Sequence, residues 1–310
     1  MGKNIIYPYI TFTQFVDEPN LKRLALFFDN IYIAEERFGI ISGINSSTLK
    51  QEYQSLLYEK SVWDYLREQG IVKTYSFPYS ENILSESNEA KILEEQMLEL
   101  MKNMNTNKTK SSTTKNTDLD KIERMNSFYT SHDICVRFDA LRLRKDNLSE
   151  YYPLLRTNSS IIQKEKKSEV IQFLLNDIPE PDFNTPWEQI IDFRTDENVK
   201  NKYLALMNWV NKVASTTTTS LSDVKEEYEY LYSEYIKHFK LHKMKYNNTL
   251  LEVVVNASTA ILLALQTGDF VSTFKNLFQL NSTHANLLSE EGKLPGKEVA
   301  YIYHTKGKFS

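Results

Sequence analysis

Residues 186–213 read PWEQIIDFRTDENVKNKYLALMNWVNKV and carry the clearest helical pattern in the 310-residue sequence. Pro186 at a first helical position, followed by apolar residues at helical spacing, predicts one helix. Thr195 and Asp196 interrupt this pattern, and an aspartate is well suited to cap the start of a second helix. Apolar residues then recur every three or four positions through Val213, which predicts that second helix. We therefore expect two helices that form a kinked pair or a tight corner and belong to a buried scaffold.

The start of the chain alternates short apolar runs with helical patterns. Residues 4–12 and 31–33 read as strands, and a helix is predicted between them. We expect the first strand to lie at an edge of its sheet, because Pro8 lacks the backbone N–H that an internal strand donates to its neighbours. A further helix is predicted over residues 86–104. A strand, a helix and a strand in so short a span indicate a small α/β unit.

A polar stretch separates this beginning from the rest of the chain. Residues 103–118 are rich in Asn, Thr, Ser and Lys and contain no large apolar side chain except Met104. Such a composition cannot bury enough apolar surface to order itself. We therefore predict a small α/β domain over 1–104, a flexible polar linker over 105–119, and a mainly helical domain over 120–310.

The second half is predicted to be mostly helical. Alternating apolar residues over 134–138 predict a strand, whereas residues 168–178 fit either a buried strand or a short helix. A long charged helix is predicted over 221–246 and a closing strand over 298–304. The expected fold class is α+β and predominantly α-helical, with a small N-terminal α/β part followed by a helical C-terminal part that ends in a strand.

The composition excludes several classes of site. One cysteine, Cys135, cannot form an internal disulfide or a Cys-based zinc site. The eight glycines form no GxGxxG or Walker arrangement, so a loop that cradles nucleotide phosphates is not expected. A formal net charge of −4 gives no specific nucleic-acid signal. We expect no bound cofactor, and we expect a cytoplasmic location because the start of the chain lacks a signal-peptide pattern.

Charged residues at the predicted corner are the first candidates for chemistry. Asp192, Arg194 and Asp196 could form a catalytic cluster. Alternatively, Arg194 forms an ion pair with a neighbouring carboxylate and fixes the corner, since structural ion pairs shift pKa values as active sites do. We favour the structural role and keep Asp192 and Arg194 as the catalytic candidates.

A second candidate site lies on the long charged helix. Glu234, His238 and His242 are spaced one turn apart and therefore share one helical face. Two histidines at this spacing can chelate a metal, with the glutamate as a third ligand, and such a site would suit a metal-dependent hydrolase. Alternatively the face is basic and solvated, because four lysines surround it: Lys237, Lys240, Lys243 and Lys245. We favour the basic face.

Two other segments allow a functional and a structural interpretation. Residues 249–266 form the most apolar predicted helix, but polar residues interrupt it, and a membrane-spanning helix needs about 20 mostly apolar residues. We favour a core helix there over a membrane-active segment covering 249–280. His132 and Asp133 lie close to Cys135 in the sequence and could suggest a base and a nucleophile. A lone cysteine is more often a small hydrophobic residue, and we favour that interpretation.

Four segments in the second half of the chain resemble an uncharacterised family of bacterial proteins, a domain of unknown function. They are PWEQIIDFRTD (186–196), ALMNWVNKVA (205–214), LHKMK (241–245) and PGKEVAYIY (295–303). The resemblance supplies no catalytic residue. It implies a bacterial protein, and because families of this kind are often encoded in defence regions, it also implies a role in antiviral defence.

The sequence therefore predicts a non-enzymatic intracellular interaction protein, a subunit of a bacterial defence or stress complex. This prediction depends on the absence of catalytic motifs, the 19 tyrosines and the long charged helix. We expect a protein partner or self-association and no contact with a membrane. The alternatives are a metal-dependent hydrolase that uses Glu234, His238 and His242, and a membrane-active effector.

Overall fold

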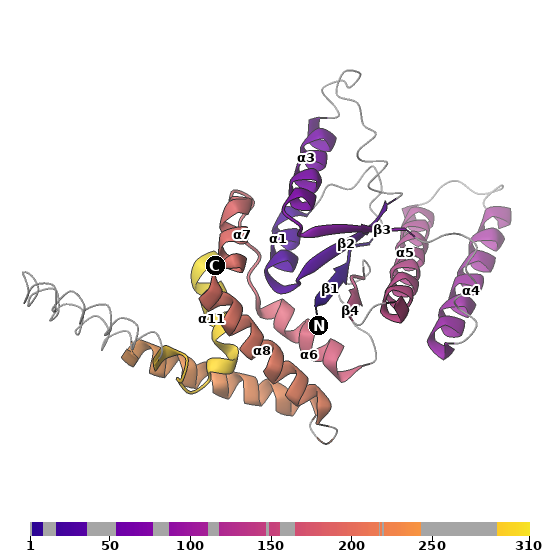
Figure 1. The fold of residues 1–310 in the computed structure, drawn as a ribbon. Coiled ribbons are helices and arrows are strands. Elements are labelled where there is room, and N and C mark those ends of the chain that lie inside the picture. Colours follow the sequence, from indigo (N-terminus) through magenta and orange to yellow (C-terminus); the bar gives the residue numbers. More distant parts are fainter. Residues whose placement is uncertain are drawn as a thin grey trace, which may run out of the picture. The chain divides into compact units, whose positions relative to one another are not determined.

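The computed structural model describes residues 2–8, 17–35, 54–76, 87–110, 118–146, 149–155, 165–216, 218, 220–242 and 290–310. The chain divides into two compact units, Met1–Ile190 (unit 1) and Ile191–Ser310 (unit 2). Unit 1 contains a parallel sheet with helices, and the described elements of unit 2 are helical (Figure 1). The expected class, α+β and predominantly α-helical with an N-terminal α/β part, is confirmed.

The sheet of unit 1 has four parallel strands. They are β1 (Lys3–Ile6), β2 (Asn30–Ala34), β3 (Val72–Tyr75) and β4 (Glu150–Pro153), in the spatial order β3-β2-β1-β4. Because β1 lies between β2 and β4, the prediction that it forms a sheet edge is wrong. Pro8 follows the last residue of the strand, Ile6, so its missing N–H removes no hydrogen bond from the ladder.

Helices cover both faces of this sheet. On one face, Ile6, Tyr75 and Tyr151 pack against α5 (Asp118–Asp146). Neighbouring residues along each strand point to the other face, where the ring of Tyr7 meets Trp63 of α3 (Gln54–Glu68) with centroids 5.4 Å apart. The remaining helices of this unit are α1 (Glu18–Phe27), α4 (Asn88–Lys110) and α6 (Lys166–Asp177). Figure 1 shows α1 and α3 on one side of the strands and α5 on the other.

The observed division of the chain differs from the predicted one. β4 follows the predicted linker, yet it pairs with β1 in the same sheet, so unit 1 extends far beyond residue 104. Residues 105–110 of the predicted linker belong to α4, whereas 111–117 lie outside the described residues. Once its first turns have formed, a helix extends readily through polar residues, because each added residue gains a hydrogen bond without a new nucleation step.

The strand predicted over residues 134–138 is wrong, because this segment lies inside α5. Val136 and Ala140, four residues apart, face the sheet and are fully buried. Ile134 and Phe138 share another face of the same helix by the same spacing. A helix that is buried on two sides carries apolar residues at alternate positions, and this imitates a strand. The open alternative at 168–178 is resolved as a helix, α6.

The helix break predicted at Thr195 and Asp196 is confirmed. α7 (Trp187–Thr195) ends there, and α8 (Glu197–Ser215) begins directly after Asp196. The Asp196 side chain accepts a hydrogen bond from the backbone N–H of Val199 at 3.0 Å, so it caps α8 as the sequence indicated. Unit 2 also contains a helix over residues 221–242.

The terminal strand predicted over residues 298–304 is wrong. The segment starts with the 3-10 turn η4 (Lys297–Val299) and continues as α11 (Ala300–Phe309). Tyr301 packs against Tyr203 of α8, with ring centroids 5.2 Å apart. Tyr303 packs on another side, against Phe239, at 5.1 Å. As in α5, large side chains alternate because two sides of the helix are covered.

Asp196→Ala is expected to destabilise the protein by about 1 kcal/mol, the usual effect of removing a side-chain helix cap. The change leaves the backbone N–H of Val199 without the 3.0 Å acceptor that it now has. Urea unfolding followed by circular dichroism would measure the effect. Asp196→Asn should restore most of the stability, because the amide oxygen can accept the same hydrogen bond; equal losses in both variants would contradict a capping role.

Candidate functional site

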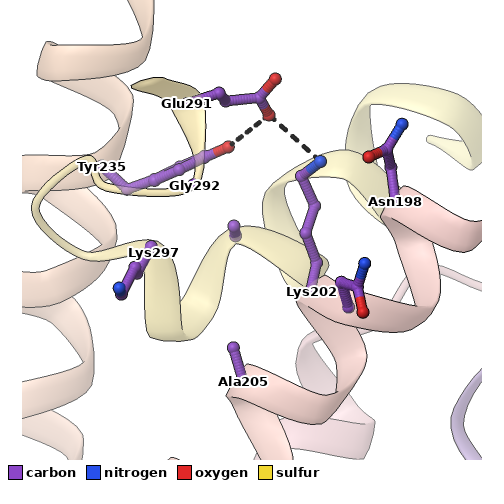
Figure 2. Close-up of a pocket in the computed structure, with 9 residues that line it drawn as sticks. Asn198, Lys202, Ala205, Tyr235, Glu291, Gly292 and Lys297 are labelled. Atoms are coloured by element: carbon purple, nitrogen blue, oxygen red, sulfur yellow. Dashed lines mark hydrogen bonds and ion pairs between the residues drawn. The ribbon is translucent and has the colours of Figure 1, made fainter. Parts of the chain in front are cut away.

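Unit 2 contains a cavity of about 340 Å³. We call it the unit 2 cavity; it lies between α8, the helix of residues 221–242 and the chain segment that starts at residue 290 (Figure 2). Its lining is mainly polar and consists of Asn198, Asn201, Lys202, Ala205, Tyr235, Glu291, Gly292, Lys297 and Ala300. Cavities of this size can hold a small molecule or one side chain of a partner.

Four side chains form a hydrogen-bonded group at the cavity, which we call the Glu291 cluster. Glu291 Oε1 lies 3.1 Å from Lys202 Nζ and 3.2 Å from His304 Nε2. The Tyr235 hydroxyl donates to the same oxygen at 3.3 Å and lies 3.0 Å from His304 Nε2. Lys202 and Tyr235 reach the carboxylate from opposite sides (Figure 2). The cluster therefore ties α8, the helix of residues 221–242 and α11 to one carboxylate.

Two members of this cluster, Glu291 and Tyr235, keep one charge state near neutral pH. Burial alone would raise the pKa of Glu291, but the hydrogen bond from His304 and the charge of Lys202 outweigh it and lower this pKa to about 2. Burial, with the neighbouring Glu291 charge, raises the pKa of Tyr235 far above its ordinary value. Efficient general acids and bases have pKa values near the working pH. Glu291 and Tyr235 are therefore suited to binding and orientation rather than to proton transfer.

Gly296 positions the segment that carries Glu291. Its backbone has a φ of +75°, a conformation that glycine adopts easily. A Cβ built on Gly296 would lie only 2.0 Å from the backbone oxygen of Leu231 and 2.9 Å from the backbone nitrogen of Tyr235. Only a residue without a side chain allows the segment to approach the helix so closely. This contact places Glu291 beside Tyr235.

The catalytic candidates at the corner do not line the unit 2 cavity. Asp196 is the cap of α8. The Asp192 side chain is exposed, and its backbone carbonyl accepts a hydrogen bond from the Thr195 hydroxyl at 3.2 Å. Arg194 is half-buried in the last turn of α7. A catalytic role for Asp192 and Arg194 stays a prediction.

Of the three predicted metal ligands, Glu234 and His238 form a close pair. Glu234 Oε2 lies 3.3 Å from His238 Nε2, and His242 is half-buried one turn further along the helix. Within the described part of the chain, no three or more His, Cys, Asp or Glu side chains are grouped so that they could hold a metal ion. The metal-dependent hydrolase stays a prediction.

The proposed pairing of His132 and Asp133 with Cys135 gains no support from its surroundings. Burial and the charge of Asp139 raise the pKa of the Cys135 thiol, and a raised pKa disfavours the reactive thiolate. The ring of His132 packs at a tilt against Phe128, one turn earlier in α5, with ring centroids 4.1 Å apart. Cys135 itself is half-buried on α5.

Sequence reasoning missed the unit 2 cavity and all four members of the Glu291 cluster. Tyr235 is 56 residues from Glu291 and 69 residues from His304, so no local spacing connects them. The one local signal was Gly296 within the segment PGKEVAYIY, where a glycine between strongly patterned neighbours indicates a close backbone approach.

Glu291→Gln is expected to make stability less dependent on pH in the acidic range. The folded state lowers the pKa of Glu291 from 4.5 to about 2, so ionised Glu291 stabilises the fold above pH 4.5 and this contribution is lost as the pH falls towards 2. We expect ionised Glu291 to contribute on the order of 1–2 kcal/mol to the free energy of unfolding. This is below the full linkage value because solvent screens the partly exposed carboxylate. Urea unfolding between pH 7 and pH 3 would show the stability difference from the wild type shrinking; a difference independent of pH would contradict this role.

Over the residues that the structure describes, no helix combines the length and apolar character needed to cross a bilayer. The segment 249–280, on which the membrane-active alternative depends, lies outside those residues.

No protein-family model, curated protein or solved structure matches the chain.

Proposed function

We propose that this chain is a non-enzymatic interaction protein and that the unit 2 cavity receives a polar group of its protein partner. The observation that carries this proposal is the Glu291 cluster, which holds an ionised carboxylate in place at an open cavity. Glu291 is held ionised, with a pKa of about 2, and Lys202 holds it at 3.1 Å. Neither Glu291 nor Tyr235 is tuned to exchange a proton near neutral pH, whereas both can orient a bound group.

Preorganisation supports binding at this place. Tyr235 is fully buried, and the side chains of Lys202 and Glu291 are only 19% and 15% exposed. Side chains that are already held in place lose little conformational entropy when a partner binds, so more of the contact energy appears as affinity. Around them, Asn198 and Asn201 are exposed at the cavity and offer both hydrogen-bond donors and acceptors.

The setting of this interaction is also part of the proposal. We propose that the protein acts in the cytoplasm, because a single cysteine is usual in a reducing compartment. The resemblance of segments such as PWEQIIDFRTD and PGKEVAYIY to a bacterial family supports a partner within a defence or stress complex. The partner is a different protein or a second copy of this chain.

Blocking the cavity would test the proposal. Asn201→Trp places a large ring at the mouth of the cavity without removing a member of the Glu291 cluster. Tagged protein expressed in its natural host is expected to co-purify with a partner, or to show the mass of an oligomer, and Asn201→Trp is expected to lose that association. Native mass determination would distinguish a partner from self-association.

Asn208→Trp is the matched control. Asn208 is another exposed asparagine of α8, and it does not line the cavity. This variant is expected to associate as the wild type does. Equal association of all three proteins, or equal loss in both variants, would refute a role for the cavity, and a monomer without any partner would refute the interaction function.

A further inference from the structure

We propose that the unit 2 cavity recognises a carboxylate, and that the group it takes from a protein partner is an acidic side chain. This inference rests on the proposed function and adds the chemical class of the ligand. It follows from the hydrogen-bond donors, the charges and the small apolar residues that line the cavity together.

The side chains that line the cavity offer more hydrogen-bond donors than acceptors and more positive than negative charges. The lining contains two ammonium groups, on Lys202 and Lys297, and one carboxylate, on Glu291. A lysine ammonium has three N–H donors, so Lys202 keeps donors available while it contacts Glu291 at 3.1 Å. The side-chain amides of Asn198 and Asn201 add further donors at the cavity. A ligand that accepts hydrogen bonds and carries negative charge satisfies this surplus.

The arrangement of the two lysines fits a small anionic group. Lys297 and Asn198 lie on opposite sides of the cavity, with Lys202 between α8 and Glu291 (Figure 2). Glu291 holds the Lys202 side chain in place, and Lys297 is exposed in the turn η4. Figure 2 shows the Lys297 ammonium directed away from Lys202, and the flexible stem of Lys297 lets this ammonium turn toward a carboxylate that Lys202 and an asparagine amide bind. Such charge-assisted hydrogen bonds are stronger than neutral ones.

The apolar part of the lining fits the stem of an acidic side chain. Ala205 and Ala300 contribute small methyl groups to the cavity, and Gly292 adds none. An aspartate or glutamate side chain combines a short apolar stem with a charged end, so it matches a lining that is apolar in one part and donor-rich in another. A cavity of about 340 Å³ is large enough for one such side chain.

The test uses the full-length protein labelled with ¹⁵N and two peptides, acetyl-Gly-Glu-Gly-amide and acetyl-Gly-Gln-Gly-amide. NMR titrations would follow the side-chain amide signals of Asn198 and Asn201. The glutamate peptide is expected to bind about tenfold more tightly than the glutamine peptide, because it replaces neutral hydrogen bonds by charge-assisted ones. Equal binding of the two peptides, or binding of neither, would overturn the proposal.

Two lysine variants separate a specific site from general attraction. Lys297→Gln is expected to weaken binding of the glutamate peptide about fivefold, as loss of a partly solvated charge pair does. Lys293→Gln changes an exposed lysine nearby that does not line the cavity, and it is expected to leave binding unchanged. Equal effects of the two variants would overturn the proposal. Tighter binding of inorganic phosphate than of the glutamate peptide would also overturn it, in favour of a phosphate site.

The two proposals fail in different ways. If Asn201→Trp abolishes association in the natural host but the glutamate peptide does not bind, the carboxylate class is wrong and the interaction function stands. If the glutamate peptide binds and Lys297→Gln weakens it, while the wild type is a monomer without any partner, the carboxylate site stands and the interaction function is wrong.

Discussion

Gly296→Ala is expected to lower the free energy of unfolding by about 3–5 kcal/mol, which is among the largest effects of single substitutions. Two causes act together. The backbone of Gly296 has a φ of +75°, which strains a residue with a side chain. The added Cβ would also lie 2.0 Å from the Leu231 oxygen and 2.9 Å from the Tyr235 nitrogen, both backbone atoms of the helix over residues 221–242. Neither can move aside as a flexible side chain would.

Two other glycines separate these causes. Gly70 has a φ of +70° but no atom within 4 Å of its added Cβ, so Gly70→Ala is expected to show only the backbone strain, about 1 kcal/mol. Gly307 lies in α11 with nothing within 4 Å, so Gly307→Ala is expected to be neutral or slightly stabilising. Urea unfolding of the three variants would give the series. If Gly296→Ala and Gly70→Ala had equal effects, the close contact with the helix would be refuted.

Limited proteolysis would give a second measurement on Gly296→Ala. Loss of the close contact is expected to release the segment that carries Glu291, and proteases would then cut between residues 290 and 300 faster than in the wild type. The wild-type rate in a destabilised Gly296→Ala protein would show that the segment stays docked and that the loss of stability arises elsewhere.

The sequence correctly predicted those helices and strands that are determined by interactions between residues close together in the chain. The cap of α8 needs only Asp196 and the N–H of Val199 three residues later, and both the helix break and the cap were predicted. The β2 strand, predicted at 31–33, was likewise found at Asn30–Ala34. For such elements the deciding interactions lie within a few residues, so the sequence pattern reports them directly.

The wrong strands share one physical origin. α5 and α11 are each covered on two sides, by the sheet and α4 for the first and by aromatic rings of α8 and the helix over 221–242 for the second. A helix with two buried sides carries apolar residues two positions apart as well as three and four. Because an alternating strand gives the same short pattern, periodicity over five to seven residues cannot separate the two.

The candidate site was not predictable for a different reason. Four segments bring the members of the Glu291 cluster together: α8, the helix over residues 221–242, the segment that starts at residue 290, and α11. Each of the four residues alone resembles an ordinary surface or core residue. The sequence did point to histidines, at 238 and 242, because regular spacing draws attention to one helical face. The histidine that joins the Glu291 cluster is His304, whose partners are distant in sequence.

Lys22→Met is expected to destabilise unit 1 by about 3–5 kcal/mol, the usual effect of removing one partner of a buried ion pair. The Lys22 side chain is fully buried, and its Nζ lies 2.9 Å from Glu18 Oε1. It also donates to the Phe183 carbonyl at 2.8 Å and lies 5.6 Å from the centroid of the Trp187 ring. Methionine can fill the space of the lysine stem, so the expected loss comes from the charge.

Removal of Lys22 leaves Glu18 as a buried charge without its cationic partner. Without Lys22, the Glu18 carboxylate stays buried at 4% exposure, and the Tyr58 hydroxyl, at 2.7 Å, is the remaining hydrogen-bond donor that the structure shows for it. A buried carboxylate without a counter-charge is strongly unfavourable. The double variant Glu18→Gln/Lys22→Met removes both charges and is therefore expected to recover at least half of the lost stability.

A second lysine tests whether burial is the cause. Lys60 and Asp64 form an ion pair with the same four-residue spacing at 2.6 Å, but their side chains are 28% and 31% exposed. Lys60→Met is expected to destabilise the protein by less than about 1 kcal/mol, because water already solvates both charges. Urea unfolding of the variants would measure the contrast. Equal losses for Lys22→Met and Lys60→Met would mean that pairing distance, rather than removal from water, determines how much a lysine stabilises this fold.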